Sequence, residues 1–184
     1  EPQTSTPATR RDETTHRTPA ERVDRWLADF ESALRSRDIA AVTSMFATDC
    51  YWRDLVAFTW NLKTVEGREQ LADMLTARLD DTAPESFAAT ETPTDDDGVV
   101  TAFLEFETAT GRGEGMLRLR QAADGDDDGR DEAWTLLTTL QELKGHEERR
   151  GASRVLGAVH GSEPDARSWA ERREAEEAEL GRTR

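Results

Sequence analysis

The apolar positions between residues 18 and 46 recur every three or four residues, which is the period of an amphipathic helix. We predict a first helix after Thr18, with Pro19 in its first turn and Glu21 closing a capping box. Its apolar positions are Val23, Trp26, Leu27, Phe30, Ala33 and Leu34. Asp38 is expected to cap a second, shorter helix with an apolar face of Ile39, Val42, Met45 and Phe46.

Residues 50–55 alternate in a way that is typical of a strand. The alternation places Cys50, Trp52 and Asp54 on one face, and it places Tyr51, Arg53 and Leu55 on the other. The segment 55–63 is apolar but irregular, and we interpret it as a loop or strand edge that closes a pocket mouth. A third helix is predicted over residues 67–79.

From residue 86 onward the apolar period becomes two. It predicts four strands, at residues 86–91, 99–108, 113–121 and 132–143, with Gly111 to Gly113 supplying one hairpin turn. Helices followed by a run of antiparallel strands predict an α+β fold. We expect a curved antiparallel sheet wrapped round the N-terminal helices, which would leave a cone-shaped cavity suited to a small apolar ligand.

The two ends of the chain lack this periodicity. Residues 1–17 are rich in Thr, Pro and charge and are predicted to be a disordered tail. Residues 18–144 form the cone domain. Residues 145–184 are predicted to be an extended arm and a connector helix, which starts near residues 162–165 and ends near Gly181. Because that helix has few large apolar residues, we expect a downstream domain to follow it.

The charge is strongly acidic, with a formal net value of −15, which argues against nucleic acid and anionic membranes as partners. Only Lys63 and Lys144 are lysines, and an acidic, Lys-poor chain that keeps its arginines is typical of halophilic proteins. We predict partial unfolding below about molar salt, because charge repulsion is then unscreened. A thermal melt that does not depend on salt would contradict this.

The single cysteine and the hydropathy pattern exclude further classes of protein. Cys50 is the one cysteine, which excludes an internal disulfide and a cysteine-ligated metal cluster. The sequence has no apolar run of membrane-spanning length and no signal-peptide pattern, so we predict a soluble cytoplasmic protein.

The histidines and a calcium-like acidic run are the candidate metal ligands of the sequence. His16, His146 and His160 lie outside the predicted cone, which argues against a His–Asp dehydratase dyad and a His-ligated metal. Residues 124–129 mimic half a calcium loop, but the twelfth position is Thr135 and the flanks are strands. A solvated acidic hairpin is the favoured interpretation.

A family resemblance begins at Phe46-Ala47, continues through Asp49 and Asp54, and includes Gly67-Arg68-Glu69. This pattern resembles the SnoaL-like, nuclear-transport-factor-type superfamily over roughly residues 18–143. The resemblance implies the same cone-shaped fold, in which homodimers are common.

A narrower resemblance involves residues 49–64 and a tail with Leu156-Gly157, His160-Gly161 and residues 169–181. These segments look like the leading domain of flavin-containing monooxygenase-like oxidoreductases. The resemblance implies FAD and NADPH only for a parent protein with a downstream flavin domain. This chain has no G-x-G-x-x-G after a strand, so no cofactor is expected in it; Gly111 to Gly115 has the wrong spacing and is interpreted as a turn.

Asp54 is the candidate catalytic residue, because its segment resembles the part of ketosteroid isomerases that carries the general base. A carboxylate in an apolar pocket can abstract a proton. In that family a tyrosine on the first helix supplies the oxyanion-hole donor, but here the position is Phe30, which has none. The alternative, which we favour, is that Asp54 pairs with Arg53, Arg118 or Arg120, or caps the turn after its strand.

The candidate ligand pocket consists of aromatic residues, which are equally at home in a plain core. These residues are Tyr51, Trp52, Phe30, Trp60 and Trp26. Phe103, Phe106 and Trp134 are expected to pack within the sheet.

Three functions remain open. The favoured one is a non-catalytic accessory domain, the N-terminal module of a flavin-dependent oxidoreductase, with a role in dimerisation, gating or small-molecule binding. The second is a free-standing isomerase or hydrolase that uses Asp54 as its base. The third is a ligand-binding homodimer.

Overall fold

A computed structural model describes residues 17–122, 130–154 and 167–180, and it divides the chain into two units, residues 1–147 and 148–184. Several predictions lie outside the described residues: the tail before residue 17, the acidic turn and calcium-like run at 124–129, and residues 155–166 and 181 of the arm. His16 and His160 lie outside them too. Within the described ranges, no helix combines the length and the apolar character needed to cross a bilayer.

Within the described residues, three helices form the N-terminal half, as predicted, but Met45 and Phe46, which were expected on the second helix, lie beyond its end, and Phe46 begins β1. Helix α1 (Pro19–Ser36) begins with the expected capping box, in which the Thr18 hydroxyl accepts from the Glu21 amide at 3.3 Å. The return bond from the Thr18 amide, at 2.8 Å, lowers the pKa of the Glu21 carboxyl. Helix α2 (Ile39–Ser44) is capped by Asp38, and helix α3 (Gly67–Thr82) follows β2 directly.

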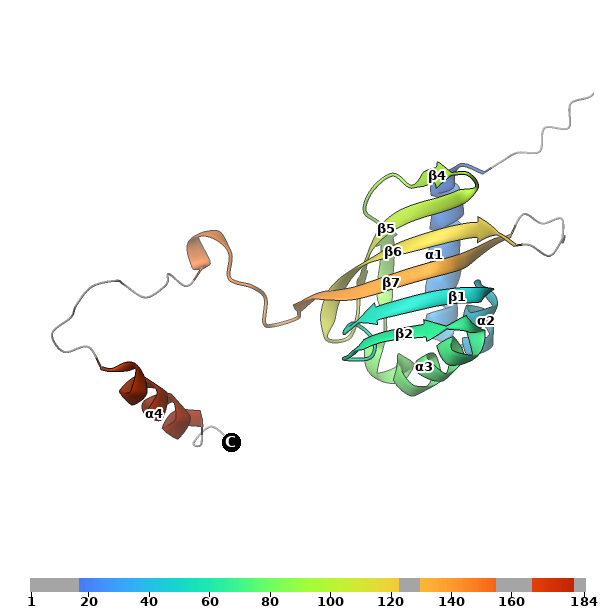
Figure 1. The fold of residues 1–184 in the computed structure, drawn as a ribbon. Coiled ribbons are helices and arrows are strands. Elements are labelled where there is room, and N and C mark those ends of the chain that lie inside the picture. The colour runs from blue at the N-terminus through green and yellow to red at the C-terminus, as the bar shows by residue number, and fades with distance from the viewer. Residues whose placement is uncertain (1–16, 123–129, 155–166, 181–184) are drawn as a thin grey trace, which may run out of the picture. The chain divides into compact units, whose positions relative to one another are not determined.

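In the part of the chain that the structure describes, seven strands form one sheet in the order β2-β1-β7-β6-β5-β3, with β4 paired to β5. Their bounds are β1 Phe46–Leu55, β2 Leu62–Glu66, β3 Glu85–Ala89, β4 Thr94–Asp96, β5 Val99–Glu107, β6 Gly111–Gln121 and β7 Asp131–Leu143. Figure 1 shows the strands crossing α1, with α2 and α3 near the end of the sheet that carries β1 and β2. The predicted α+β cone is confirmed.

One strand pair departs from the predicted antiparallel arrangement. Strands β1 and β7 are parallel, with Trp52 opposite Leu136 and Asp54 opposite Thr138, whereas the other described strand pairs are antiparallel. The pair joins the first strand of the chain to the last long one. No local pattern signals such a pairing, because it depends on how the two halves of the domain meet.

Two short strands were not predicted. In β2 only Val65 is buried, and all three residues of β4 are exposed, so neither strand carries the apolar alternation of a half-buried strand. Both lie outside the central run of long strands, β2 as an edge strand and β4 as a short strand beside β5.

The glycines of β6 do not form the predicted hairpin turn. Thr108 closes the turn by accepting from the Gly111 amide at 2.9 Å, and Gly113 and Gly115 occupy inward positions of the strand. A Cβ at Gly113 would lie 2.3 Å from the Phe106 ring, and one at Gly115 would lie 2.4 Å from the Leu137 carbonyl oxygen. These glycines therefore let the ring and the neighbouring strand approach closely.

The second unit contains η1 (Gly151–Ser153) and α4 (Trp169–Leu180). Every residue of α4 is exposed, in line with its few large apolar side chains. Ser168 and Glu171 form a capping box at its start, and Arg173 pairs with Glu177 at 3.0 Å. Described by itself, α4 is thus a polar helix supported by local contacts.

Candidate functional site

Asp54 lies at the end of β1, fully buried, and its carboxylate accepts hydrogen bonds at both oxygens. The Phe58 amide donates to both oxygens at 3.1 Å, and the Thr59 amide and hydroxyl each donate to Oδ2 at 2.8 Å. The Thr138 hydroxyl donates to Oδ1 at 2.7 Å. All these donors are neutral, so Asp54 is stabilised by hydrogen bonds rather than by an ion pair.

The carboxylate caps the loop that follows its strand. Val56 and Trp60 in this loop have φ angles of +59° and +53°, and the Val56 amide bonds to the Asn61 carbonyl at 3.1 Å. Positive φ at a β-branched residue is strained. Because Asp54 binds two consecutive loop amides, it compensates for that strain. Turn capping was one of the two structural alternatives for Asp54.

The other alternative, an Asp54–arginine pair, is wrong. Arg120 pairs with Asp49 instead, and the hydrogen bond from Arg120 lowers the pKa of that exposed carboxyl. Arg53 reaches the Thr64 hydroxyl at 3.4 Å. Both arginines, like Arg118, belong to the outer positions of their strands, whereas Asp54 points inward.

Trp52 connects the Asp54 network to the core. Its indole Nε1 donates to the Thr138 hydroxyl at 2.9 Å, and that hydroxyl in turn donates to Asp54. The three side chains form one fully buried chain of hydrogen bonds. Each polar group in it is satisfied, which is the condition for such a network to stabilise a core.

Aromatic rings fill the interior of the cone. The Trp52 ring is central, with its centroid 4.9 Å from that of Phe58, 5.9 Å from Phe46 and 6.0 Å from Phe30. Phe30, which was aligned by resemblance with the oxyanion donor of ketosteroid isomerases, is fully buried among packed aromatic rings. Three cavities of the described residues lie elsewhere, and neither Asp54 nor Trp52 lines any of them.

The structure brings together only part of the predicted aromatic pocket. Trp52 and Phe30 are in the core, and Trp26, 4 % exposed, stacks on Phe30. Tyr51 lies on the opposite face of β1 and is 44 % exposed. Trp60 is in the loop after β1 and is 54 % exposed. The five residues therefore do not share one cavity.

The outer face of the sheet carries an apolar row that the sequence analysis did not predict, with Phe103 exposed and Met116 and Leu137 half-buried. Phe103, Met116 and Leu137 lie directly opposite one another on β5, β6 and β7, and Arg53 on β1 continues the row. Phe103 was expected to pack within the sheet, but it is 50 % exposed. The sequence shows that Phe103 and Phe106 lie on opposite faces of the strand. It does not show which of the two is outward, because a register error of one residue exchanges the inner and outer faces.

Charged residues flank this outer row. Glu105 and Glu114 are directly opposite each other on β5 and β6, which places like charges side by side. Arg118 lies two residues beyond Met116 on β6 and makes no ion pair within 4 Å with the described residues. The outer face therefore holds unpaired charge of both signs beside the apolar row.

Comparison with known proteins identifies the fold and nothing narrower. No protein-family model matches the sequence, and no curated protein matches it either. A ketosteroid isomerase-like protein from Erwinia carotovora atroseptica superposes with a TM-score of 0.54 at 13 % identity, covering 68 % of this chain and 98 % of that one.

Two further solved structures agree. An NTF2-like protein with a cystatin-like fold from Novosphingobium aromaticivorans superposes with a TM-score of 0.50 at 16 % identity, covering 65 % of this chain and 80 % of that one. A protein of unknown function with a cystatin-like fold from Nostoc punctiforme gives 0.50 at 17 % identity, covering 66 % and 90 %. The chain has the NTF2-like cone fold; at these identities, fold does not determine function.

Proposed function

We propose that this domain is a non-catalytic accessory module that assembles with a second copy of itself through the outer face of its sheet. The observation that carries the proposal is that the interior of the cone is filled. Trp52 fills it, and both oxygens of Asp54 are occupied by hydrogen bonds within the protein.

Catalysis by Asp54 would need a free lone pair beside a space for substrate. Four donor groups already bind this carboxylate, and the Phe58 ring lies in the adjoining core. Phe30 offers no hydrogen-bond donor to a developing oxyanion. An isomerase mechanism would therefore require the core and the β1–β2 loop to open together.

The outer face fits a second copy by its charge pattern. The chain carries a net charge of −15, so most of its surface repels another copy. The outer face instead combines the apolar row Phe103–Met116–Leu137 with charges of both signs. A self-complementary face of this kind suits an isologous two-fold contact.

The register of β6 defines the proposed contact further. Glu114 and Arg118 lie two residues on either side of Met116, on the same face. A two-fold axis that runs along the apolar row would bring each Glu114 onto Arg118 of the second copy. The ion pair with Arg118 of the second copy would offset the repulsion between Glu114 and its like-charged neighbour Glu105.

Sedimentation of the domain tests the proposal. The wild type is expected to be a dimer, and Phe103→Asp or Met116→Asp is expected to give a folded monomer. Trp60→Asp is the control, since Trp60 is equally exposed but lies in the β1–β2 loop. Glu114→Arg should weaken the dimer, and adding Arg118→Glu should restore it. A monomeric wild type, or a dimer unaffected by the Phe103 and Met116 variants, overturns the proposal.

The finer part of the proposal is that the module serves a flavin-dependent oxidoreductase. It rests on the resemblance of residues 49–64 and of the tail to leading domains of that group. The gene region that follows this sequence should encode a strand with G-x-G-x-x-G, and the whole product should purify with flavin absorbance. A gene without that strand removes the flavin partner but leaves the dimer test standing.

A further inference from the structure

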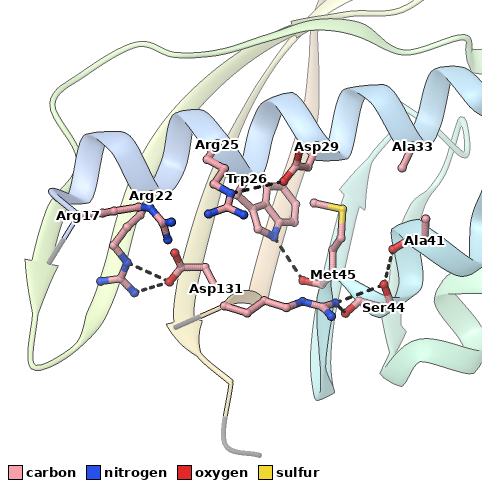
Figure 2. Close-up of a pocket in the computed structure, with 11 residues that line it drawn as sticks. Arg17, Arg22, Arg25, Trp26, Asp29, Ala33, Ala41, Ser44, Met45 and Asp131 are labelled. Carbon is pink, nitrogen blue, oxygen red and sulfur yellow. Dashed lines mark hydrogen bonds and ion pairs between the residues drawn. The ribbon is translucent and has the colours of Figure 1, made fainter. Parts of the chain in front are cut away.

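A cavity of about 450 Å³ lies between α1, α2 and the start of β7, outside the cone (Figure 2). Its volume is in the range of small-molecule sites. The apolar part of its lining comes from Trp26, Ala33, Ala41 and Met45. Trp26 stacks on Phe30 with ring centroids 4.6 Å apart, and Phe30 contacts Trp52, so aromatic rings separate this cavity from the Asp54 network.

The polar part of the lining is cationic, in contrast to the acidic chain as a whole. Among the residues that the structure describes, four arginines and two aspartates line the cavity: Arg17, Arg22, Arg25, Arg130, Asp29 and Asp131. Concentrated positive charge on a molecule with a net charge of −15 is the arrangement that an anion-binding site requires, because the remaining surface repels anions.

One arginine and one aspartate neutralise each other. Arg22 places Nε 2.9 Å and Nη2 2.5 Å from Asp131 Oδ1, and its Nη1 lies 3.2 Å from Asp95. The Arg22 side chain is only 10 % exposed. This arginine is therefore a fixed part of the wall, and its donors are already used.

Two other arginines retain donor capacity. Arg25 makes a long ion pair with Asp29, in which Nε lies 3.9 Å from Oδ2 and thus beyond hydrogen-bond distance, and the Arg25 side chain is 61 % exposed. Arg130 uses Nη2 to donate to the Ser44 carbonyl and hydroxyl oxygens. Its other nitrogens have no hydrogen-bond partner in the part of the chain that the structure describes. Figure 2 shows Arg25 and Trp26 side by side on α1, above Met45.

We propose that this cavity binds a planar aromatic carboxylate, with the carboxylate on the guanidinium groups of Arg25 and Arg130 and the ring against Trp26 and Met45. A guanidinium binds a carboxylate through paired hydrogen bonds. Asp29 remains in the wall, so a monoanion is favoured over the dianion of a phosphate monoester. The site is independent of the proposed dimer, because it lies at α1 and α2 rather than on the outer face.

Titration calorimetry with 2-naphthoate tests the site, with 2-naphthalenemethanol as the neutral analogue. The carboxylate should bind, and the alcohol should bind at least about tenfold more weakly, because it lacks the charge-assisted hydrogen bonds. Arg25→Gln and Arg130→Gln should each weaken 2-naphthoate by about tenfold. Both positions are exposed, so the melting temperature should stay close to that of the wild type.

Arg35→Gln is the matched control, since Arg35 is on the same helix, is exposed and pairs with Glu31 away from this cavity. Its affinity for 2-naphthoate should equal that of the wild type. The proposal is overturned by equal binding of the alcohol, by an equal loss in Arg35→Gln, or by no binding of the carboxylate. Tighter binding of 2-naphthyl phosphate overturns the assignment to a monoanion.

Discussion

The two faces of the same strands differ in almost every physical respect. On β5, Phe106 points inward and is 2 % exposed, whereas Phe103 points outward and is 50 % exposed. On β6 the inward positions begin with three glycines, and the outward ones carry Arg112, Glu114, Met116 and Arg118. The inner face is buried, aromatic and satisfied in its hydrogen bonds, and the outer face carries mixed apolar and charged side chains that are incompletely paired.

The difference shows which face has interactions left to form. In this fold the concave face of the sheet is the natural place to look for a ligand, but here its space is occupied by the Trp52 ring and the rings around it. Unused donors, acceptors and apolar area are found on the outer face and in the arginine-lined cavity instead. Because the interior is filled, the surfaces that can still bind a partner or ligand lie on the exterior of the cone.

The largest expected contrast is between the two phenylalanines of β5. Phe106→Ala should lower the free energy of unfolding by about 3–5 kcal/mol, because it leaves a cavity beneath the sheet. Phe103→Ala should change it by less than about 1 kcal/mol when measured at concentrations where the domain is monomeric. Urea denaturation followed by tryptophan fluorescence measures both. Similar losses for the two variants would show that the outer position is buried in the isolated domain.

Gly115→Ala tests the close approach of β6 to β7. The added methyl would lie 2.4 Å from the Leu137 carbonyl oxygen, which is backbone and cannot rotate away, so a loss of about 1–3 kcal/mol is expected. Glu114→Ala is the neighbouring control on the outer face and removes a like-charge contact with Glu105. Urea midpoints should therefore fall for the glycine variant and stay level or rise for the control.

Asp54→Asn should destabilise the β1–β2 loop. The amide keeps one acceptor but presents an NH₂ group to amides and hydroxyls that donate, which leaves a buried donor unsatisfied and costs about 1–3 kcal/mol. Limited proteolysis should then cut within residues 56–61. Asp49→Asn is the control, because the Asp49 side chain is 59 % exposed on its pair with Arg120, and exposed pairs contribute little. An Asp54 variant as stable as the wild type would contradict the capping role.

Cys50 provides the smallest contrast, between a buried thiol and the exposed positions beside it. Burial raises the pKa of the thiol, and the side chain is 1 % exposed. The neutral thiol is favoured in the folded state. The contribution of the buried neutral thiol to folding stability is therefore complete below the ordinary thiol pKa of about 8.5. It is lost as the pH rises through the raised pKa of the folded state. Native protein at pH 8 should resist alkylation, and unfolded protein should react at once; rapid native alkylation would contradict burial.

Periodicity in the sequence predicted the elements whose signals are local. The capping box at Thr18, the Asp38 cap and the alternation around Trp52 all depend on neighbouring residues, and all three predictions are confirmed. Turn capping by Asp54 was foreseen only as one alternative, since its donor Thr138 is far away in the chain.

Features that depend on distant contacts could not be predicted in the same way. The parallel pairing of β1 with β7 is set by how the two halves meet. The inward glycines are explained only when the Phe106 ring is seen against Gly113. Ala41 and Met45 line a cavity together with Arg130, which directly precedes β7. Sequence periodicity could not predict this contact, because the residues are far apart in the chain.

The pairing of β7 with β1 also has a consequence for synthesis on the ribosome. Thr138 binds Asp54 across a separation of 84 residues, and β7 supplies one side of the core that Trp52 occupies. The nascent chain therefore exposes its aromatic N-terminal half until the last long strand has emerged. Such late closure of long-range contacts slows folding and favours contact with chaperones during translation.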